Sequence, residues 1–304
     1  MIIIECFQEN LPFFYVSVFI FGLLVGSFLN VVIYRLPVMM EREWKRECIE
    51  FLGRESSVDN IADSSENSEQ KDVFNLVVPR SRCPKCGKLI TALENIPVIS
   101  YIMLRGKCGG CGNKISIRYP LIELFSAILS VVVAYKFGVS GTFVATLILT
   151  YSLISLALID FDTQYLPDDI ILPLLWGGML LSLTEYSIVK SPGEAIIGAV
   201  AGYMSLWLFS YAFKKIRKKD GMGNGDFKLF AVFGAWFGWE SLPSIIVLSS
   251  FVGAVIGITV LTLQKKDSDT QIPFGPYLAA AAFIYLNFDK AINSYYLDKL
   301  ISPQ

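Results

Sequence analysis

Long apolar runs fill most of this sequence, and they restrict the folds open to it more than any other feature. Of its 304 residues, 54% are hydrophobic and 17% are charged, whereas a soluble domain carries about 25% charged residues. An apolar stretch of about 20 residues can cross the roughly 30 Å hydrocarbon core of a bilayer as a helix. We therefore expect an all-α polytopic membrane protein held in a lipid bilayer.

The apolar segments predict about eight transmembrane helices. The first, residues 11–34, follows an acidic start that lacks the basic flank of a cleaved signal peptide, so we interpret it as a retained anchor. The others are residues 120–137, 141–159, 170–183, 194–213, 227–239, 242–263 and 274–288. Because residues 227–239 are few for a complete span, whether Phe227 to Trp239 crosses fully stays open.

Basic residues collect in alternate connections between these segments, namely residues 80–118, 214–219 and 265–266. Under the positive-inside rule these connections face the cytoplasm, and both chain ends then lie outside. The polar residues 35–119 form a cytoplasmic lobe in this arrangement. Within the lobe, residues 41–72 are rich in Ser, Glu and Asp, which predicts a mobile, solvated loop.

Four GxxxG spacings lie inside the apolar segments. They are Gly22/Gly26, Gly198/Gly202, Gly234/Gly238 and Gly253/Gly257. Small residues one helical turn apart let helix backbones approach closely in lipid. We expect these glycines to serve packing within the bundle rather than dimerisation or catalysis.

Two CxxC pairs lie in the polar lobe. Their cysteines are Cys83, Cys86, Cys108 and Cys111. A glycine follows each pair and suits the tight turn of a metal-binding knuckle, and two such knuckles supply the four thiolates of a tetrahedral zinc site. Four sulfur ligands leave no open position, so we predict a structural zinc, with unbound thiols or an iron–sulfur site as the alternatives. The basic surroundings fit a membrane surface with anionic lipids, so we expect no nucleic-acid partner.

The sequence contains no histidine. This absence excludes Ser-His-Asp and Cys-His nucleophilic catalysis as well as zinc hydrolase sites of the His-Glu-x-x-His type. Hydrolytic chemistry in this chain therefore depends on carboxylates, Lys, Tyr, Ser or Cys.

Two acidic clusters lie at the ends of predicted spans, both on the cytoplasmic side. One contains Asp160 and Asp162, and the other ends with Asp226 after a glycine-rich run. Carboxyl groups at membrane boundaries are costly and often functional. Two that come together can share one proton, so that the ionised group activates water while the protonated group polarises a peptide carbonyl.

Structural roles are also open to these acids. Asp168 and Asp169 follow a proline at a predicted helix start, which favours capping, and Asp162 fits a solvated loop. Asp226 fits an N-cap as well as a catalytic group. The glycines at 221, 223 and 225 do not form a GxGxxG nucleotide motif, but they do permit close backbone approach.

Several motifs in the same order make the chain resemble the type IV prepilin peptidases, which are GxGD-type aspartyl membrane proteases also called prepilin leader peptidases. The motifs are residues 26–37, both cysteine pairs, and residues 94–97, 118–123, 160–168 and 225–229. The resemblance implies cleavage of the short leader of type IV prepilins and pseudopilins on the cytoplasmic side, after a glycine. It also implies N-methylation of the new N-terminal residue with S-adenosylmethionine.

The resemblance implies catalytic residues too. The family's two aspartates fall on Asp160, which lies seven residues before Pro167, and on Asp226 of the GxGD element. Asp162 is the alternative to Asp160. The residues that bind the methyl donor are not identified by the resemblance.

Three domains follow from this resemblance. Residues 1–34 are expected to be the N-terminal anchor helix, residues 35–119 the methyltransferase-associated cytoplasmic lobe with its zinc site, and residues 120–304 the membrane-embedded peptidase domain. The implied location is the bacterial inner (cytoplasmic) membrane, with the active site facing the cytoplasm.

Two other functions are compatible with the residues alone. One is a membrane transporter or ion-coupled carrier that uses the same intramembrane acids, and the other is a zinc-dependent membrane scaffold. The acids lie at one face rather than near the midplane, and no repeat relates the two halves of the chain. Both observations favour the protease.

Overall fold

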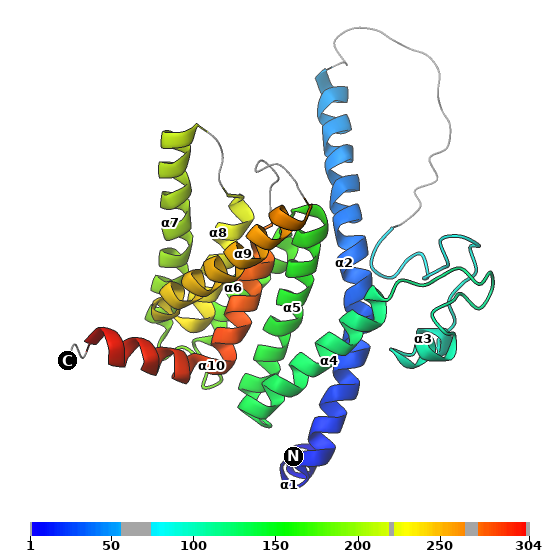
Figure 1. The fold of residues 1–304 in the computed structure, drawn as a ribbon, viewed down its shortest axis with the longest axis horizontal. Helices are drawn as coiled ribbons and strands as arrows, with labels where there is room; N and C mark the ends of the chain where they lie inside the picture. The colour runs from blue at the N-terminus through cyan, green and yellow to red at the C-terminus, as the bar shows by residue number, and fades with distance from the viewer. Residues whose placement is uncertain (1, 56–73, 219–221, 265–272, 302–304) are drawn as a thin grey trace. The chain divides into compact units, whose positions relative to one another are not determined.

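The structure is a computed structural model that describes residues 2–55, 74–218, 222–264 and 273–301, and the named elements in these ranges are all helical. They are α1 (Ile2–Glu9), α2 (Leu11–Glu55), η2 (Leu93–Asn95), α3 (Ile99–Met103), α4 (Arg118–Phe137), α5 (Gly141–Thr163), α6 (Asp168–Leu181), α7 (Pro192–Arg217), α8 (Asn224–Phe237), η3 (Trp239–Ser241), α9 (Leu242–Gln264) and α10 (Gly275–Ile301) (Figure 1). The chain separates into two compact units. Unit one comprises Met1–Gly22 and Ser126–Gln304, and unit two comprises Leu23–Phe125.

Five helices within the described ranges are long and apolar enough to cross a bilayer. They are Leu11–Leu52, Arg118–Phe137, Gly141–Thr163, Pro192–Arg217 and Trp239–Ile256. They indicate a multi-pass membrane protein, as the sequence predicts. The eight-span arrangement stays a prediction, since α6 and α8 have 14 residues each and a helix of that length is about 21 Å long.

The first long helix extends well beyond its predicted end. The sequence predicts a loop over residues 41–72, but α2 continues through Glu55, so the first part of that prediction is wrong. Opposite charges at helical spacing explain the difference, because the Lys45 ammonium lies 2.6 Å from the Glu41 carboxylate one turn away and such pairs support exposed helices. The rest of the predicted loop, from residue 56 onward, lies outside the described residues.

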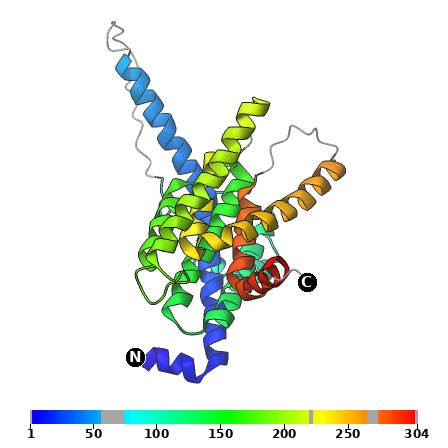
Figure 2. The same cartoon turned by 90° about the vertical axis from the view of Figure 1, so that its left-hand side faces the viewer.

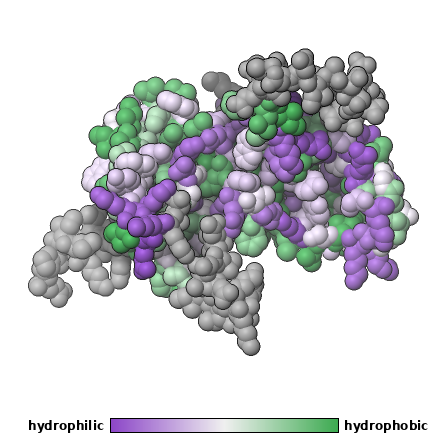
Figure 3. Space-filling model, turned by 90° about the horizontal axis from the view of Figure 1, so that it is seen from above, coloured by the Kyte–Doolittle hydropathy of each residue, from purple (hydrophilic) through white to green (hydrophobic). Residues whose placement is uncertain are grey.

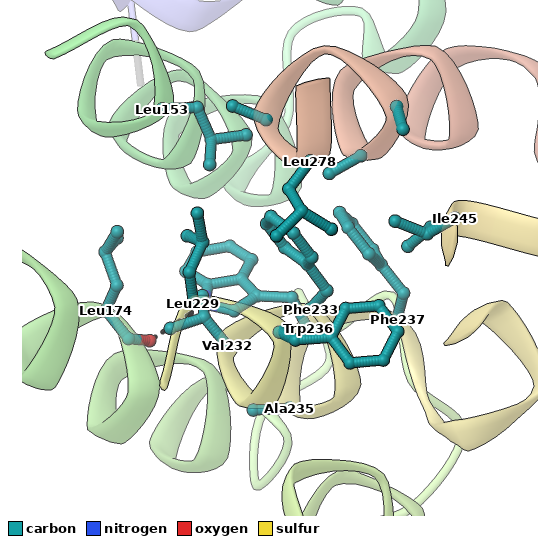
Figure 4. Close-up of a cluster of buried hydrophobic side chains, with 14 of the residues drawn as sticks. Leu153, Leu174, Leu229, Val232, Phe233, Ala235, Trp236, Phe237, Ile245 and Leu278 are labelled. Atoms are coloured by element: carbon teal, nitrogen blue, oxygen red, sulfur yellow. Dashed lines mark hydrogen bonds between the residues drawn. The ribbon is translucent and has the colours of Figure 1, made fainter. Parts of the chain in front are cut away.

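The short helix α8 occupies the centre of unit one. Every residue from Asp226 to Phe237 except Lys228 is buried, and α6, α7, α9 and α10 pack around the helix (Figure 2). Its side chains meet those of the surrounding helices in one apolar core, where the Trp236 indole N–H donates to the Leu174 carbonyl at 2.8 Å (Figure 4). A helix that is apolar on all sides is typical of such a buried position.

Glycines bring α7 and α8 into backbone contact. A Cβ on Gly198 would collide with the Gly234 carbonyl oxygen, and one on Gly202 would lie 2.6 Å from the Phe230 carbonyl oxygen. Real Cβ atoms do not approach so closely, so these positions admit only glycine without movement of a helix. The predicted packing role is confirmed for Gly198, Gly202 and Gly234. It is wrong for Gly238, which caps the end of α8 with a positive φ.

The end of α7 is strongly polar. Lys214, Lys215 and Arg217 lie in its last turn, where positive charge interacts favourably with the negative end of the helix dipole. Hydrophilic side chains are plentiful on the end of the molecule seen from above (Figure 3).

Unit two contains three buried polar side chains with backbone partners. The Arg35 guanidinium donates to the Asn75 and Pro79 carbonyls at 2.9 and 2.6 Å. The Glu123 carboxylate accepts the Val98 N–H at 2.8 Å, and the Asn30 amide donates to the Tyr119 carbonyl at 3.2 Å. Buried polar groups need such partners, so these contacts fix the polar segments of this unit onto α2 and α4.

Candidate active site and metal centre

Asp160 lies in the last turn of α5. Helix α5 ends because Gln164 adopts a left-handed conformation with φ of 58° and donates its N–H to the Asp160 carbonyl. The Asp160 side chain is buried, with 5% of the residue exposed. Its Oδ2 atom accepts the backbone N–H of Gly275 at 3.0 Å, so a residue far along the chain holds this carboxylate.

Asp226 lies in the first turn of α8. The N-cap of this helix is Gly223, with no side-chain capping bond, so the N-cap interpretation of Asp226 is wrong. The residue is 8% exposed, and its Oδ1 atom has no hydrogen-bond partner among the described residues. A buried polar atom without a partner is costly, and in a protein it often marks a functional group.

The fold brings these two aspartates together. Helix α10 packs against both α5 and α8, and its first residue, Gly275, contacts Asp160 at the end of α5. The two carboxyl groups are near enough to interact electrostatically. Two acids that are separated in sequence are therefore both buried in unit one, within electrostatic reach of each other.

The neighbouring acids are placed differently. Asp162 is exposed on α5. Asp168 and Asp169 lie in the first turn of α6, but the N-cap is Pro167 without a side-chain capping bond, so the capping prediction is wrong. Asp168 instead accepts two hydrogen bonds from the Lys228 ammonium, at 2.9 and 2.7 Å. Of the acids that the sequence singles out, only Asp160 and Asp226 are buried.

The glycines around Asp226 fit close contacts within the chain. A Cβ on Gly225 would lie 2.7 Å from Leu166 Cβ, whereas one on Gly223 would meet only Asp226 Oδ2, at an ordinary 3.7 Å. The close approach in the structure is thus between Gly225 and the segment after α5. Sequence reasoning missed Gly275 altogether, although the Phe-Gly-Pro sequence that opens the last apolar segment is a typical helix start.

The four predicted cysteine ligands lie together in unit two. Their sulfur atoms are all within 4.8 Å of one another, with Cys83 and Cys111 at 3.8 Å and Cys86 and Cys108 at 4.0 Å. A tetrahedral zinc with Zn–S bonds of about 2.3 Å separates its sulfurs by roughly 3.8 Å. The cluster therefore has the dimensions that a four-thiolate metal site requires.

The two CxxC turns are built in the same way. In each turn the glycine after the second cysteine has a positive φ, 70° at Gly87 and 67° at Gly112, and donates its N–H to the carbonyl of the first cysteine at 2.9 Å. A short antiparallel bridge closes each turn, Arg82 with Leu89 and Lys107 with Lys114. A side chain is disfavoured at such φ values, which explains both glycines.

The electrostatics of the cluster favour a bound cation. Backbone N–H groups of Cys86 and Lys85 point at the Cys83 sulfur and lower its pKa to about 6. The Lys88 N–H acts in the same direction on Cys86, but the Cys111, Cys83 and Cys108 thiols and burial together raise the pKa of Cys86 to about 11. Without a metal ion, the negative charge on one sulfur thus opposes ionisation of its neighbour. A bound metal ion neutralises this charge, so that all four thiols can be ionised.

An ion pair covers the second cysteine turn. The Lys88 ammonium lies 2.7 Å from the Glu94 carboxylate. A Cβ on Gly109 would lie 2.9 Å from Glu94 Oε1, and one on Gly110 would lie 2.9 Å from Lys88 Cδ. The two glycines between Cys108 and Cys111 thus leave room for the Lys88–Glu94 ion pair, whose lysine belongs to the first cysteine turn.

Fold and site together define a helical membrane protein with a buried aspartate pair and a separate four-cysteine cluster. Residues 20–137 match the bacterial peptidase A24 N-terminal domain, and residues 147–258 match the type IV leader peptidase family. The chain belongs to the type IV leader peptidase family.

Curated relatives cover almost the whole chain. Proteins named prepilin leader peptidase/N-methyltransferase are 47% identical in Aeromonas hydrophila, over 96% of this chain and 97% of the relative, and 48% identical in Pseudomonas aeruginosa, over 93% of both. The protein of that name from Neisseria gonorrhoeae is 46% identical over 90% of both. A comparison with solved structures found no significant match.

Proposed function

We propose that this protein is a prepilin leader peptidase and N-methyltransferase. The proposal rests chiefly on one observation: within a chain of the leader peptidase family, Asp160 and Asp226 lie buried together at the ends of α5 and α8. Its substrates are type IV prepilins and pseudopilins. The transporter and scaffold alternatives have no comparable support, since close relatives along nearly the full chain carry the peptidase name.

The aspartate pair supplies the peptidase chemistry. One carboxyl group is ionised and takes a proton from water, so that the oxygen of the water attacks the scissile carbonyl carbon. The other is protonated and donates to the carbonyl oxygen, and a proton then passes to the leaving amine as the peptide bond breaks. The chain contains no histidine, and these two acids supply the proton donor and the proton acceptor that the reaction requires.

The four cysteines hold a structural zinc in this proposal. Cys83, Cys86, Cys108 and Cys111 fit a tetrahedral Zn²⁺ in number, spacing and sulfur chemistry. The ion would neutralise the thiolates and tie the two turns together. The cluster has no open ligand position, so it takes no part in cleavage.

The methyl donor is S-adenosylmethionine in this proposal, and residues 35–119 are the part of the chain associated with methyl transfer. The anchor helix then comprises residues 1–34 and the peptidase domain residues 120–304. Eight spans in the bacterial inner membrane, with α6, α8 and α10 added to the five long helices, leave the aspartates open to the cytoplasm. The three basic connections support this orientation.

The central experiment is leader cleavage by purified protein in detergent, with the mass of the new N-terminus measured. Asp160→Asn and Asp226→Asn should each abolish cleavage, at least a thousandfold, because each removes one of the two groups that move protons. Both variants should still methylate a substrate that has already been cleaved. The matched control is Asp162→Asn on the exposed face of α5, which should cleave at the wild-type rate.

The outcome that contradicts the assignment is equally specific. Cleavage by Asp160→Asn together with loss of cleavage in Asp162→Asn would exchange the roles of these residues. Cleavage by both Asp160→Asn and Asp226→Asn would remove the aspartate mechanism.

A further inference from the structure

Gly275 is the one residue outside α5 whose hydrogen bond to the Asp160 side chain is recorded within the described ranges. Its N–H lies 3.0 Å from Asp160 Oδ2, and it is the first residue of α10. Pro276 has no N–H group. The next two N–H groups, those of Tyr277 and Leu278, both donate to the Phe274 carbonyl. The first turn of α10 thus directs a single donor at the carboxylate.

This donor favours the ionised form of Asp160. A hydrogen bond to a carboxylate stabilises its negative charge. Asp226 is less completely satisfied, although the Gly223 N–H also acts on its carboxyl group. Its Oδ1 is buried without a partner among the described residues, and an unpartnered buried oxygen costs less in a neutral carboxyl group than in a charged one.

We propose that Gly275 is a positioning residue that makes Asp160 the ionised, water-activating member of the pair and leaves the shared proton on Asp226. This inference rests on the proposed aspartate mechanism and assigns a role to each acid within it. Gly275 acts through Asp160 and does not itself contact the reacting atoms.

The need for glycine here is steric. A Cβ at position 275 would lie 2.6 Å from Asp160 Oδ2 and 3.1 Å from its Cγ, and the φ of Gly275 is not positive. Alanine therefore fits the backbone but not the carboxylate, so Gly275→Ala displaces the Asp160 side chain from its donor. Because the carboxylate is buried, it has little room to move aside.

The test compares Gly275→Ala with wild type in cleavage and methylation. We expect kcat for cleavage to fall about tenfold to a hundredfold, the range for loss of one hydrogen bond to a charged group, with KM within about twofold. The acidic limb of the kcat profile should move to higher pH, because the ionised form of Asp160 loses its donor. Methylation of a cleaved substrate should stay at the wild-type rate, which shows that the chain is folded.

Two matched variants separate positioning from general disturbance. Gly253→Ala presses on Tyr277 of α10, where its Cβ would lie 3.1 Å from the ring, and Gly177→Ala adds a Cβ with nothing within 4 Å. Both should keep the wild-type pH profile. A shifted profile in Gly253→Ala would assign the effect to movement of α10 as a whole and would overturn the specific role of Gly275.

A second measurement needs no variant. Dicyclohexylcarbodiimide is soluble in lipid and reacts with protonated carboxyl groups, so mapping of the label by mass spectrometry on wild type at neutral pH should find Asp226 ahead of Asp160. Preferential labelling of Asp160 would reverse the assigned roles.

The two levels of the proposal fail in different ways. If Asp160→Asn and Asp226→Asn still cleave, the aspartate mechanism itself is wrong. If both are inactive while Gly275→Ala cleaves with the wild-type kcat and pH profile, only the role of Gly275 is wrong.

Discussion

Glu94 illustrates how a partly exposed carboxylate supports a metal site that it does not ligate. The Lys88 ammonium and the Thr91 backbone and hydroxyl groups lower the pKa of Glu94 to about 2. A lowered pKa in the folded state means that the group stabilises the fold above its ordinary value near 4.3 and loses this effect only as the pH falls toward 2. The Lys88–Glu94 pair is therefore intact at every pH at which the thiolates bind metal.

We expect Glu94→Gln to release zinc faster to a chelator, by about threefold to tenfold at pH 7, because a charged hydrogen bond over the second cysteine turn is replaced by a weaker neutral one. Chelator-dependent zinc release, followed with a metal indicator, measures this rate. Glu41→Gln removes a similar pair on α2, at 2.6 Å from Lys45, and should leave the rate unchanged. Equal rates in Glu94→Gln and wild type would show that the pair does not support the cluster.

The positions of individual residues were predictable where a short sequence motif determines them. The four cysteines are brought together as their spacing predicts. Of the two aspartates that the resemblance weighs, Asp160 is buried and Asp162 is exposed, and the catalytic role of Asp160 stays a prediction. Gly275 was not predictable, because its contact joins residues that lie 115 positions apart. No local pattern states which backbone N–H will face a given carboxylate.

At the level of helices, α7 and α8 depend on the absence of side chains at their contact. Gly202→Val should lower stability by about 1–3 kcal/mol, since overpacking of a close contact costs this much and the first added carbon already lies 2.6 Å from the Phe230 carbonyl oxygen. Thermal unfolding in detergent measures the loss.

The same helix provides the control for this change. A Cβ on Gly193 would meet only Ser191 Oγ, at 3.9 Å, so Gly193→Ala should shift the unfolding temperature by less than about 2 °C. A Gly202→Val variant as stable as Gly193→Ala would contradict the close contact.

The sequence predicts these helices well where apolar composition alone decides. The segments expected at residues 120–137, 141–159 and 242–263 correspond closely to α4, α5 and α9. The continuation of α2 to Glu55 escaped prediction, since charge pairs along a helix resemble a solvated loop in composition. The crossing of α6 and α8 also cannot be read from length, because neighbouring helices rather than lipid surround α8.

For the whole molecule, the separation into two compact units places the cysteine cluster and the aspartate pair in different parts of the chain. Elemental analysis should find about one zinc per chain, and Cys83→Ser with Cys111→Ser should abolish it, because half of the ligands are lost. Replacing Cys6 and Cys48 instead, both outside the cluster, should leave the zinc content intact. Retention of zinc by the Cys83 and Cys111 double variant would disprove the assigned ligands.

The enclosure of α8 also bears on how the protein enters the membrane during synthesis. A segment of 14 residues is shorter than the roughly 20 that insert independently, and it carries Asp226 near its start. Its apolar surface is matched to α6, α7, α9 and α10 rather than to lipid. We therefore expect α8 to leave the insertion machinery as one hairpin with α7, and the peptidase site to exist only after α10 has been synthesised and has closed over it.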